Sequence, residues 1–374
     1  MENQPQTIGI IGLGTMGLGI AQVFAQAGFD TIATDAQAAT RDSARARMTE
    51  ALTARVAAGK LTVADCAATL SNLHIADTLT AFAACDLVIE AIIERTDAKQ
   101  ALLAQLEAIV SPGVILATNT SSIPVAALAV QMTHPARLLA LHFFNPPTAM
   151  KLVELAPHGG TSDHALHSAR ALCEAAGKTV IQCPDRPGFI VNRCARPFYG
   201  EALALLEEGT DAQTIDAAML AAGYRLGPFG LIDLIGADIN LAATSGLHSA
   251  MGNHPRYHAF AALNHQIAVG NLGRKSGHGF VFPANTAPQA NADITLRIEA
   301  TLANEAAWLL SEGGTNPQGI DTAMKLGLNF PRGPFELLAL HGKSTILTTL
   351  NALEAAAPPH LKSRYLPAPG LAAS

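Results

Sequence analysis

The chain is poor in charged residues, aromatic residues and cysteine, and each shortage excludes a class of protein. Charged side chains make up 14% of the 374 residues, the net charge is −6, and no basic run is interleaved with aromatic residues. A nucleic-acid partner is therefore not expected. The five cysteines have no paired spacing, which predicts reduced thiols in a cytoplasmic protein and not a disulfide framework. We also expect no metal site.

Long apolar runs are missing as well. No run approaches the ~18 apolar residues that a membrane span needs. The first residues, 1–7, have neither the basic nor the apolar region of a signal peptide, so no membrane association is expected. Apolar residues still make up 49% of the chain, which is ample material for large buried cores. A chain of this length predicts roughly two or three domains.

A glycine-rich turn near the N-terminus is the most informative motif. The apolar run 7–11 ends in Gly12-x-Gly14-x-x-Gly17, and an alanine-rich helical pattern follows at once. In such a motif the first glycine makes the tight turn out of the strand, and the second lets a pyrophosphate approach the backbone. The third lets the helix pack close to the sheet, and the N–H groups at the helix N-terminus attract phosphates. The motif predicts a dinucleotide site, with an ordinary strand–turn–helix as the alternative.

An acid follows this motif at the spacing that a dinucleotide site requires. Asp35 ends the second apolar run, 18 residues past Gly17 and close to the usual ~20. Its carboxylate can accept hydrogen bonds from the adenosine ribose hydroxyls, and its charge would repel a 2′-phosphate. Asp35 therefore predicts a preference for NAD over NADP.

Short apolar runs alternate with helical patterns through the first half of the chain. This alternation predicts an α/β fold with a Rossmann-type, doubly wound and mostly parallel sheet. Residues 41–84 interrupt the alternation and are expected to form a helical hairpin that projects from the sheet. The expected strands are Thr7–Ile11, Thr31–Thr34, Leu87–Ala91, Ile115–Thr118, Leu138–Phe143 and Thr179–Gln182.

Beyond about residue 185, strand-like runs disappear and amphipathic helical patterns replace them, so an all-α C-terminal part is expected. Three blocks of this part recur in the same order 104 to 106 residues later, which predicts a helical unit duplicated in tandem. The expected domains are 1–184, 185–283 and 290–374. The blocks Glu201–Gly209, Ile215–Met219 and Gly227–Leu231 recur as Glu305–Gly313, Ile320–Met324 and Gly333–Leu337.

Polar clusters follow apolar runs at three further places, namely residues 118–122, 142–147 and 151–154. Ligands bind at the carboxyl ends of parallel strands, so Ser121, His142 and Asn145 are expected at the edge that carries the glycine-rich turn. His142 and Glu154 are candidates for an acid–base pair in which the carboxylate holds the imidazole tautomer.

Each of these residues also has a structural interpretation when it is taken alone. His142 would be a hydrogen-bonding residue at a strand end, and Glu154 a solvated charge. Ser121 would cap the next helix. Asn192 would be a polar residue on a helix face.

Five motifs in one order resemble the 3-hydroxyacyl-CoA dehydrogenase family. The resemblance runs from residue 7 to about residue 283, and the duplicated unit extends it to about residue 350. Bacterial members with a duplicated C-terminal unit, of the 3-hydroxybutyryl-CoA and 3-hydroxyadipyl-CoA dehydrogenase type, are the most similar. The motifs are Gly12-Leu-Gly-Thr-Met-Gly17, Asn119-Thr-Ser-Ser122, His142-Phe-Phe-Asn-Pro146, Lys151-Leu-Val-Glu154 and Pro187-Gly-Phe-Ile-Val-Asn-Arg193.

The resemblance implies NAD-dependent oxidation of an L-3-hydroxyacyl-CoA to the 3-oxoacyl-CoA, and the reverse reaction. It implies that His142 is the general base for the 3-hydroxyl proton and that Glu154 orients His142. Ser121 and Asn192 would hydrogen-bond the reacting oxygen or the thioester carbonyl. The positions implied to bind NAD are Gly12, Gly14, Thr15, Met16, Gly17, Asp35, Glu94, Lys99, Asn119 and Asn145.

The chain departs from the family pattern in the expected CoA-phosphate contacts. Family members often have Lys or Ser on the projecting hairpin, where this chain has Ala51, Ala54 and Ala58. Arg55 and Lys60 lie nearby and are the candidates to replace those contacts.

A second departure lies in the later helical copy, which has Leu296 where the first copy has Asn192, so we expect that copy to be structural. Single-copy members of the family dimerise through this domain. A duplicated chain can satisfy that interface internally, which predicts an internal pseudo-dimer and a monomer or an atypical homo-oligomer.

Two other functions compete with this interpretation. A non-catalytic NAD-binding or structural relative would not need Ser121, His142, Glu154 and Asn192, which are all retained. A free 3-hydroxyacid dehydrogenase would have a catalytic lysine four residues before the matching asparagine, where this chain has Gly188.

Overall fold

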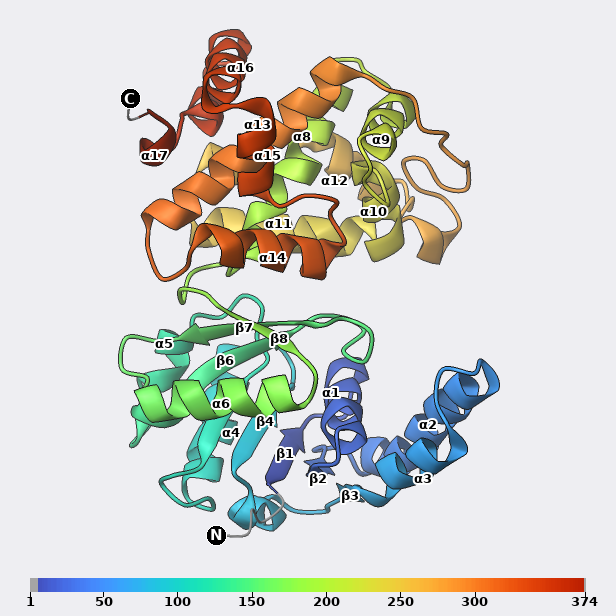
Figure 1. Cartoon of the computed structure of the whole chain (residues 1–374), viewed down its shortest axis with the longest axis vertical. Coiled ribbons are helices and arrows are strands. Elements are labelled where there is room, and N and C mark those ends of the chain that lie inside the picture. The colour runs from blue at the N-terminus through green and yellow to red at the C-terminus, as the bar shows by residue number, and fades with distance from the viewer. Residues whose placement is uncertain (1–5, 373–374) are drawn as a thin grey trace. The chain divides into compact units, whose positions relative to one another are not determined.

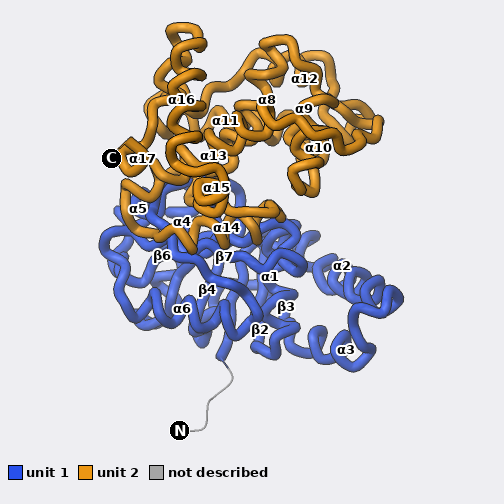
Figure 2. The backbone as a smooth tube through the Cα atoms, turned by 45° about the horizontal axis from the view of Figure 1, so that its top comes forward, with its two compact units in different colours: residues 1–186 blue, residues 187–374 orange. Residues whose placement is uncertain are grey.

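The computed structural model describes residues 6–372. All strands of this part lie in the N-terminal half, and the C-terminal half is built of helices (Figure 1). The chain divides between Arg186 and Pro187 into two compact units (Figure 2). The predicted order along the chain, an α/β part followed by an all-α part, is confirmed. The further division at residues 185–283 and 290–374 stays a prediction, since both segments belong to the second unit.

The first unit contains one sheet of eight strands in the order β3-β2-β1-β4-β5-β6-β7-β8. All neighbouring strands are parallel except β6 and β7, which pair antiparallel. The sheet is therefore mostly parallel, as predicted. The strands are β1 (Thr7–Ile11), β2 (Asp30–Thr34), β3 (Leu73–Ile75), β4 (Leu87–Glu90), β5 (Ile115–Thr118), β6 (Leu138–Phe143), β7 (Leu152–Pro157) and β8 (Thr179–Gln182).

The six expected strands are present with bounds that differ by at most one residue, and β3 and β7 were not predicted. β3 has three residues and lies inside a polar stretch, so it has no periodic signal of its own. β7 is the apolar segment that follows the expected His142 cluster, and only its acid was interpreted. The connection 144–151 is too short for the crossover that a parallel partner of β6 would need, so β6 and β7 form a hairpin.

Helices cover the sheet, and every residue of β4, β5 and β6 is buried. Parallel strands that are buried on both faces read as continuous apolar runs, which explains why these strands were easy to recognise. Polar side chains of this unit consequently gather where the strands end. The covering helices are α1 (Thr15–Gln26), α4 (Thr96–Glu107), α5 (Val125–Ala129) and α6 (Asp163–Ala175).

The expected hairpin exists, although it is helical over only part of residues 41–84. It consists of α2 (Ala38–Ala57) and α3 (Val63–Ser71), followed by β3 and the 3-10 helix η1 (Leu79–Ala84). Thr62 begins α3 with a capping box, in which its hydroxyl accepts the N–H of Asp65 at 3.0 Å. α2 buries Ala44, Met48 and Leu52, which are spaced four residues apart on one face.

The second unit is helical throughout its described residues, with only an isolated bridge between Gly273 and His278. Its helices are α7 (Val191–Cys194), α8 (Arg196–Glu207), α9 (Ala212–Ala221), α10 (Pro228–Ile235), α11 (Ala237–Ala250), α12 (Ala261–Ala268), α13 (Ala292–Ser311), α14 (Pro317–Leu328), α15 (Pro334–His341), α16 (Lys343–Ala356) and α17 (Pro369–Ala372). The short helices η3 (Pro255–Tyr257), η4 (Arg274–Ser276) and η5 (Lys362–Tyr365) connect them.

The two sequence repeats share a local device at the start of α10 and of α15. Asp216 accepts the N–H of Phe229 at 2.9 Å, and Asp321 accepts the N–H of Phe335 at 2.8 Å. Each acid reaches the helix N-terminus across a glycine, because a Cβ on Gly227 would lie 2.3 Å from the Asp216 carboxyl carbon. The repeated blocks are thus similar in local structure as well as in sequence.

The two halves of this unit are joined by reciprocal ion pairs. In the first set, Arg193 donates through Nε to Glu305 at 2.7 Å and through both Nη atoms to Glu312 at 2.7 and 2.8 Å. Tyr257 donates to the same oxygen of Glu305 at 2.6 Å, and Arg256 lies 2.9 Å from the other oxygen. The two donors, Arg193 and Tyr257, and the ion-pair partner Arg256 come from the first half, and both acids come from the second.

The second set exchanges the roles of the halves. Arg297 donates through Nε to Glu201 at 2.7 Å and through its Nη atoms to Glu208 at 2.6 and 2.7 Å. Tyr365 donates to Glu201 at 2.9 Å, and Arg364 donates to it at 3.2 Å. The contacts are reciprocal, since Arg193 of the first half contacts Glu305 of the second, and Arg297 of the second half contacts Glu201 of the first.

Candidate active site

The glycine-rich turn connects β1 to α1, and its three glycines occupy different environments. Gly12 has φ +94°, and a Cβ there would lie 2.7 Å from the Ala91 carbonyl oxygen. A Cβ on Gly17 would lie 1.7 Å from the Gly12 carbonyl oxygen, so the first turn of α1 packs directly on the loop. A Cβ on Gly14 would meet nothing within 4 Å. The turn thus leaves open space beside Gly14, next to Thr15 and Met16 at the start of α1, where a pyrophosphate fits.

Asp35 follows β2 and is tied to the same turn. Its carboxylate accepts the N–H of Leu13 at 2.8 Å and the N–H of Gln37 at 2.9 Å. Leu13 lies between Gly12 and Gly14. Asp35 therefore shapes the glycine-rich loop, in addition to the contact with the ribose that the sequence predicts.

Lys99, Glu90 and Glu94 form an ion-pair network at the carboxyl end of β4. Lys99 is 1% exposed, and its ammonium lies 2.9 Å from both carboxylate oxygens of Glu90 and 3.3 Å from Glu94. The family motif implies that Lys99 contacts the cofactor, and that contact stays a prediction, since the ammonium as observed is paired with Glu90 and Glu94. The Lys99 ammonium forms an ion pair with the Glu94 carboxylate and so fixes the position of Glu94. Glu90 was not predicted as a site residue. It is also buried, and its carboxylate accepts a hydrogen bond from the Thr118 hydroxyl.

Glu94 in turn organises the loop that follows β5. One carboxylate oxygen accepts the Thr120 hydroxyl, the Ser121 N–H at 3.2 Å and the Ser122 hydroxyl at 2.9 Å. Burial alone would raise the pKa of Glu94, but the hydrogen bonds from Thr120 and Ser122 and the charge of Lys99 hold that pKa below its ordinary value. Glu94 is consequently a carboxylate at neutral pH, and it fixes Ser121.

Asn119 ties this loop to the next strand. Its side-chain oxygen accepts the N–H of Phe143 at 2.8 Å, which joins the end of β5 to the end of β6. Asn145 lies two residues beyond Phe143 and is exposed. Ser121, Asn119 and Asn145 therefore follow the carboxyl ends of β5 and β6, which are parallel to β1 and end at the same edge of the sheet.

His142 and Glu154 are cross-strand partners in the β6–β7 hairpin. Nδ1 of His142 lies 2.7 Å from Oε2 of Glu154, and Glu154 is fully buried. A buried carboxylate at this distance favours the tautomer with the proton on Nδ1, which places the basic lone pair on Nε2. The Phe144 ring covers the imidazole at a centroid distance of 4.5 Å. The contact with Glu154 thus holds the imidazole in one orientation, which is the arrangement that general-base catalysis requires.

Lys178 fastens the loop between β6 and β7, and no sequence signal identified it. Its ammonium donates to the carbonyl oxygens of Pro147 and Met150, the latter at 2.9 Å. Burial lowers the pKa of Lys178 to about 8. The side chain holds the segment that begins directly after Asn145.

The remaining predicted residues lie elsewhere. Arg55 is in the last turn of α2, and its carbonyl oxygen accepts the N–H of Lys60 at 2.9 Å at the exposed tip of the hairpin. Asn192 lies in α7 of the second unit. Their proposed roles stay predictions.

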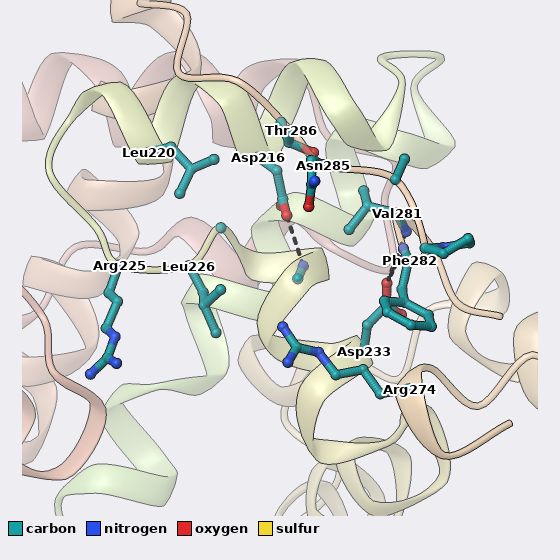
Figure 3. Close-up of a pocket in the computed structure, with 14 residues that line it drawn as sticks. Asp216, Leu220, Arg225, Leu226, Asp233, Arg274, Val281, Phe282, Asn285 and Thr286 are labelled. Atoms are coloured by element: carbon teal, nitrogen blue, oxygen red, sulfur yellow. Dashed lines mark hydrogen bonds between the residues drawn. The ribbon is translucent and has the colours of Figure 1, made fainter. Parts of the chain in front are cut away.

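A cavity of about 450 Å³ in the second unit contains none of the predicted site residues (Figure 3). Both acidic residues that line the cavity are hydrogen-bonded to the backbone. Asp216 accepts N–H groups of α10, and Asp233 accepts those of Phe280, Val281 and Phe282. Within residues 6–372, no group of three or more His, Cys, Asp or Glu side chains is placed to hold a metal ion. No helix in this range has the length and apolar character of a membrane span.

Family models match both units. The model described as 3-hydroxyacyl-CoA dehydrogenase, NAD binding domain, matches residues 7–186. The model described as 3-hydroxyacyl-CoA dehydrogenase, C-terminal domain, matches residues 188–282 and 294–370. The last two segments coincide with the two halves of the helical repeat.

Individual relatives agree with the family models. The 3-hydroxyadipyl-CoA dehydrogenase of Escherichia coli (strain K12) is 43% identical over 280 residues, a match that covers 73% of this chain and 58% of that protein. A probable 3-hydroxybutyryl-CoA dehydrogenase of Deinococcus radiodurans is 41% identical over 274 residues, covering 73% of this chain and 98% of that protein. The crystal structure of 3-hydroxybutyryl-CoA dehydrogenase from Escherichia coli K12 matches with a TM-score of 0.91 at 32% identity, covering 98% of each chain.

Proposed function

The chain belongs to the 3-hydroxyacyl-CoA dehydrogenase family, and we propose that His142 and Glu154 perform the acid–base half of the family's reaction. The reaction is the NAD-dependent oxidation of a 3-hydroxyacyl-CoA to the 3-oxoacyl-CoA, and its reverse. The observation that carries the proposal is the 2.7 Å contact between His142 and the buried Glu154, at the edge of the sheet where the glycine-rich turn also lies.

The residues around the turn fit a nicotinamide dinucleotide. The open space beside Gly14 takes the pyrophosphate, Asp35 faces the ribose, and Glu94, Asn119 and Asn145 follow the strand ends. Bound NAD supplies the hydride acceptor. Nε2 of His142 removes the proton of the 3-hydroxyl group, and Glu154 stabilises the imidazolium that forms.

The substrate oxygen also needs a donor while charge develops on it. Ser121 provides a hydroxyl in a position that Glu94 fixes through the Ser121 N–H. Asn192 is included through its match to the family motif. Fixed donors of this kind stabilise a developing oxyanion better than mobile water does.

The assay is reduction of acetoacetyl-CoA by NADH with the purified full-length chain, measured by loss of NADH absorbance. The names of the relatives also suggest 3-oxoadipyl-CoA, and free acetoacetate is the matched control without the thioester. We expect turnover of a CoA thioester and none of the free acid. Turnover of the free acid alone would support the hydroxyacid dehydrogenase alternative. NADH binding without turnover of any thioester would support the non-catalytic alternative.

We infer in addition that the helical unit is an internal pseudo-dimer. The reciprocal sets around Glu305 and Glu201 support this inference. Arg193 and Tyr257 of the first half contact Glu305, and their equivalents in the second half, Arg297 and Tyr365, contact Glu201. A chain that satisfies this interface internally has no such surface to offer a second copy. We expect light scattering after size exclusion to report one chain of 38.8 kDa at micromolar concentration. A dimer joined through the helical unit would contradict the inference, whereas an oligomer joined through another surface would be the atypical homo-oligomer that the sequence also allows.

A reducing compartment such as the cytoplasm is the location that we propose. None of the five cysteines forms a disulfide. Burial raises the pKa of Cys85 and that of Cys173 to about 12, which leaves them as protonated, unreactive thiols.

A further inference from the structure

The Leu13 peptide of the glycine-rich turn is held from two sides by side chains of opposite charge. Its N–H donates to Asp35 at 2.8 Å. Its carbonyl oxygen accepts from Nη2 of Arg47 at 2.9 Å, and the same nitrogen lies 3.3 Å from the Thr40 carbonyl oxygen. The guanidinium of Arg47 and the carboxylate of Asp35 therefore both lie beside one residue of the dinucleotide loop.

A second arginine approaches Asp35 from the same helix. Arg41 is on α2, and its Nη1 donates to the Asp35 carbonyl oxygen at 2.8 Å and lies 3.3 Å from the Ala36 carbonyl oxygen. Its Nε lies 3.5 Å from Asp77, a residue whose side chain is 88% exposed. An ion pair with so exposed a partner is weak, so the contact with Asp77 contributes little to the position of Arg41.

Both guanidiniums keep donors that the protein does not use. Among residues 6–372, Nη2 of Arg41 and Nη1 of Arg47 donate to no protein acceptor, and the buried Nε atoms of both residues also have no hydrogen-bond partner. Arg47 forms no ion pair with any carboxylate in this part of the chain. Buried donors without acceptors are uncommon in folded proteins. Two arginines with spare donors thus lie next to the acid that faces the ribose.

We propose that Arg41 and Arg47 form a latent binding site for the 2′-phosphate of a phosphorylated dinucleotide, which the charge of Asp35 keeps from binding. Guanidinium groups bind phosphate through paired, charge-assisted hydrogen bonds. A carboxylate in the same place repels the phosphate and accepts the ribose hydroxyls instead. The preference for NAD thus depends on the Asp35 carboxylate, which lies close to two guanidinium groups.

The site concerns the cofactor of the proposed reaction, so the proposal rests on the proposed function. It is tested by direct binding of NADH and NADPH, measured by nucleotide fluorescence, which requires no turnover. Asp35→Asn is the informative variant, because the asparagine side-chain oxygen can still accept the Leu13 N–H while the charge is removed and the Gln37 N–H loses its acceptor. We expect its affinity for NADPH, relative to NADH, to rise roughly 10- to 100-fold over wild type, the range of one charge-assisted hydrogen bond.

Second substitutions assign that gain to the two arginines. In Asp35→Asn/Arg41→Leu and in Asp35→Asn/Arg47→Leu the gain should be lost, with a steep salt dependence that disappears with it. Asp35→Asn/Arg45→Leu is the matched control and should keep the gain, because Arg45 lies on the same helix but donates to the Leu73 carbonyl oxygen. The ratio of the two affinities separates a lost phosphate contact from a loosened loop, which would weaken both nucleotides alike.

Two results would overturn the proposal. One is an Asp35→Asn variant with no relative gain in NADPH binding, and the other is a gain that persists without Arg41 and Arg47. A wild-type chain that binds NADH but reduces no acyl-CoA would count against the proposed reaction and leave this site unaffected.

Discussion

Replacing His142 by alanine is expected to lower kcat by about 100-fold or more, the usual effect of removing a general base. The reason is geometric, since His142 is held at 2.7 Å by a carboxylate that has no exposure to solvent. NADH affinity should barely change, because all but Asn145 of the residues predicted to contact the dinucleotide follow other strands, and the substitution leaves Asn145 itself in place. Steady-state kinetics with acetoacetyl-CoA and a separate NADH titration measure both quantities.

Two further variants separate catalysis from general damage. Glu154→Gln keeps the size of the side chain but removes the charge that stabilises the imidazolium, and kcat should fall on the order of 10- to 100-fold. His164→Ala is the matched control, since His164 is an exposed histidine on α6 and its loss should leave kcat unchanged. Near-normal turnover in His142→Ala would remove His142 from the mechanism.

The parts of the site that the sequence predicted are those set by local pattern. Glycines at fixed spacing after an apolar run identified the turn, and Asp35 followed at the end of the next strand. His142 and Glu154 were proposed as a pair from residue type and proximity in sequence. The physical reason for their contact, the antiparallel register of β6 and β7, required the structure because β7 was not recognised as a strand.

The parts that the sequence did not predict depend on contacts between distant segments. The buried pairing of Lys99 with Glu90 was not predicted, because nothing in the sequence around Lys99 indicates which acid lies against its ammonium. Lys178 reaches carbonyl groups about 30 residues earlier in the chain, and backbone acceptors leave no trace in sequence. The duplication was recognised from three blocks, but the matching pairs Arg256-Tyr257 and Arg364-Tyr365 fall outside them. Two residues are too short a signal without the shared acid that each pair contacts.

Glu305→Ala is expected to lower the free energy of unfolding of the second unit by roughly 3–5 kcal/mol, the usual cost of removing one partner from a buried ion pair. Glu305 is 1% exposed, accepts hydrogen bonds from Arg193 and the Tyr257 hydroxyl, and lies 2.9 Å from Nε of Arg256 as an ion pair. Although burial alone would lower the pKa of Arg193, Glu312 and Glu305 raise it, so the guanidinium stays charged. Alanine would leave these donors buried without their shared acceptor.

Denaturant titration can follow this loss within the second unit, because Trp308 is the chain's single tryptophan and lies on α13 with Arg256 4.6 Å from its ring. Lys275→Ala is the matched control within the same unit, since both side chains of the Lys275–Asp238 pair are exposed and the pair should contribute about 0.5 kcal/mol or less. Glu201→Ala should cost as much as Glu305→Ala, because Glu201 occupies the equivalent position in the other half. If Glu305→Ala cost no more than Lys275→Ala, the reciprocal network would not be what joins the two halves.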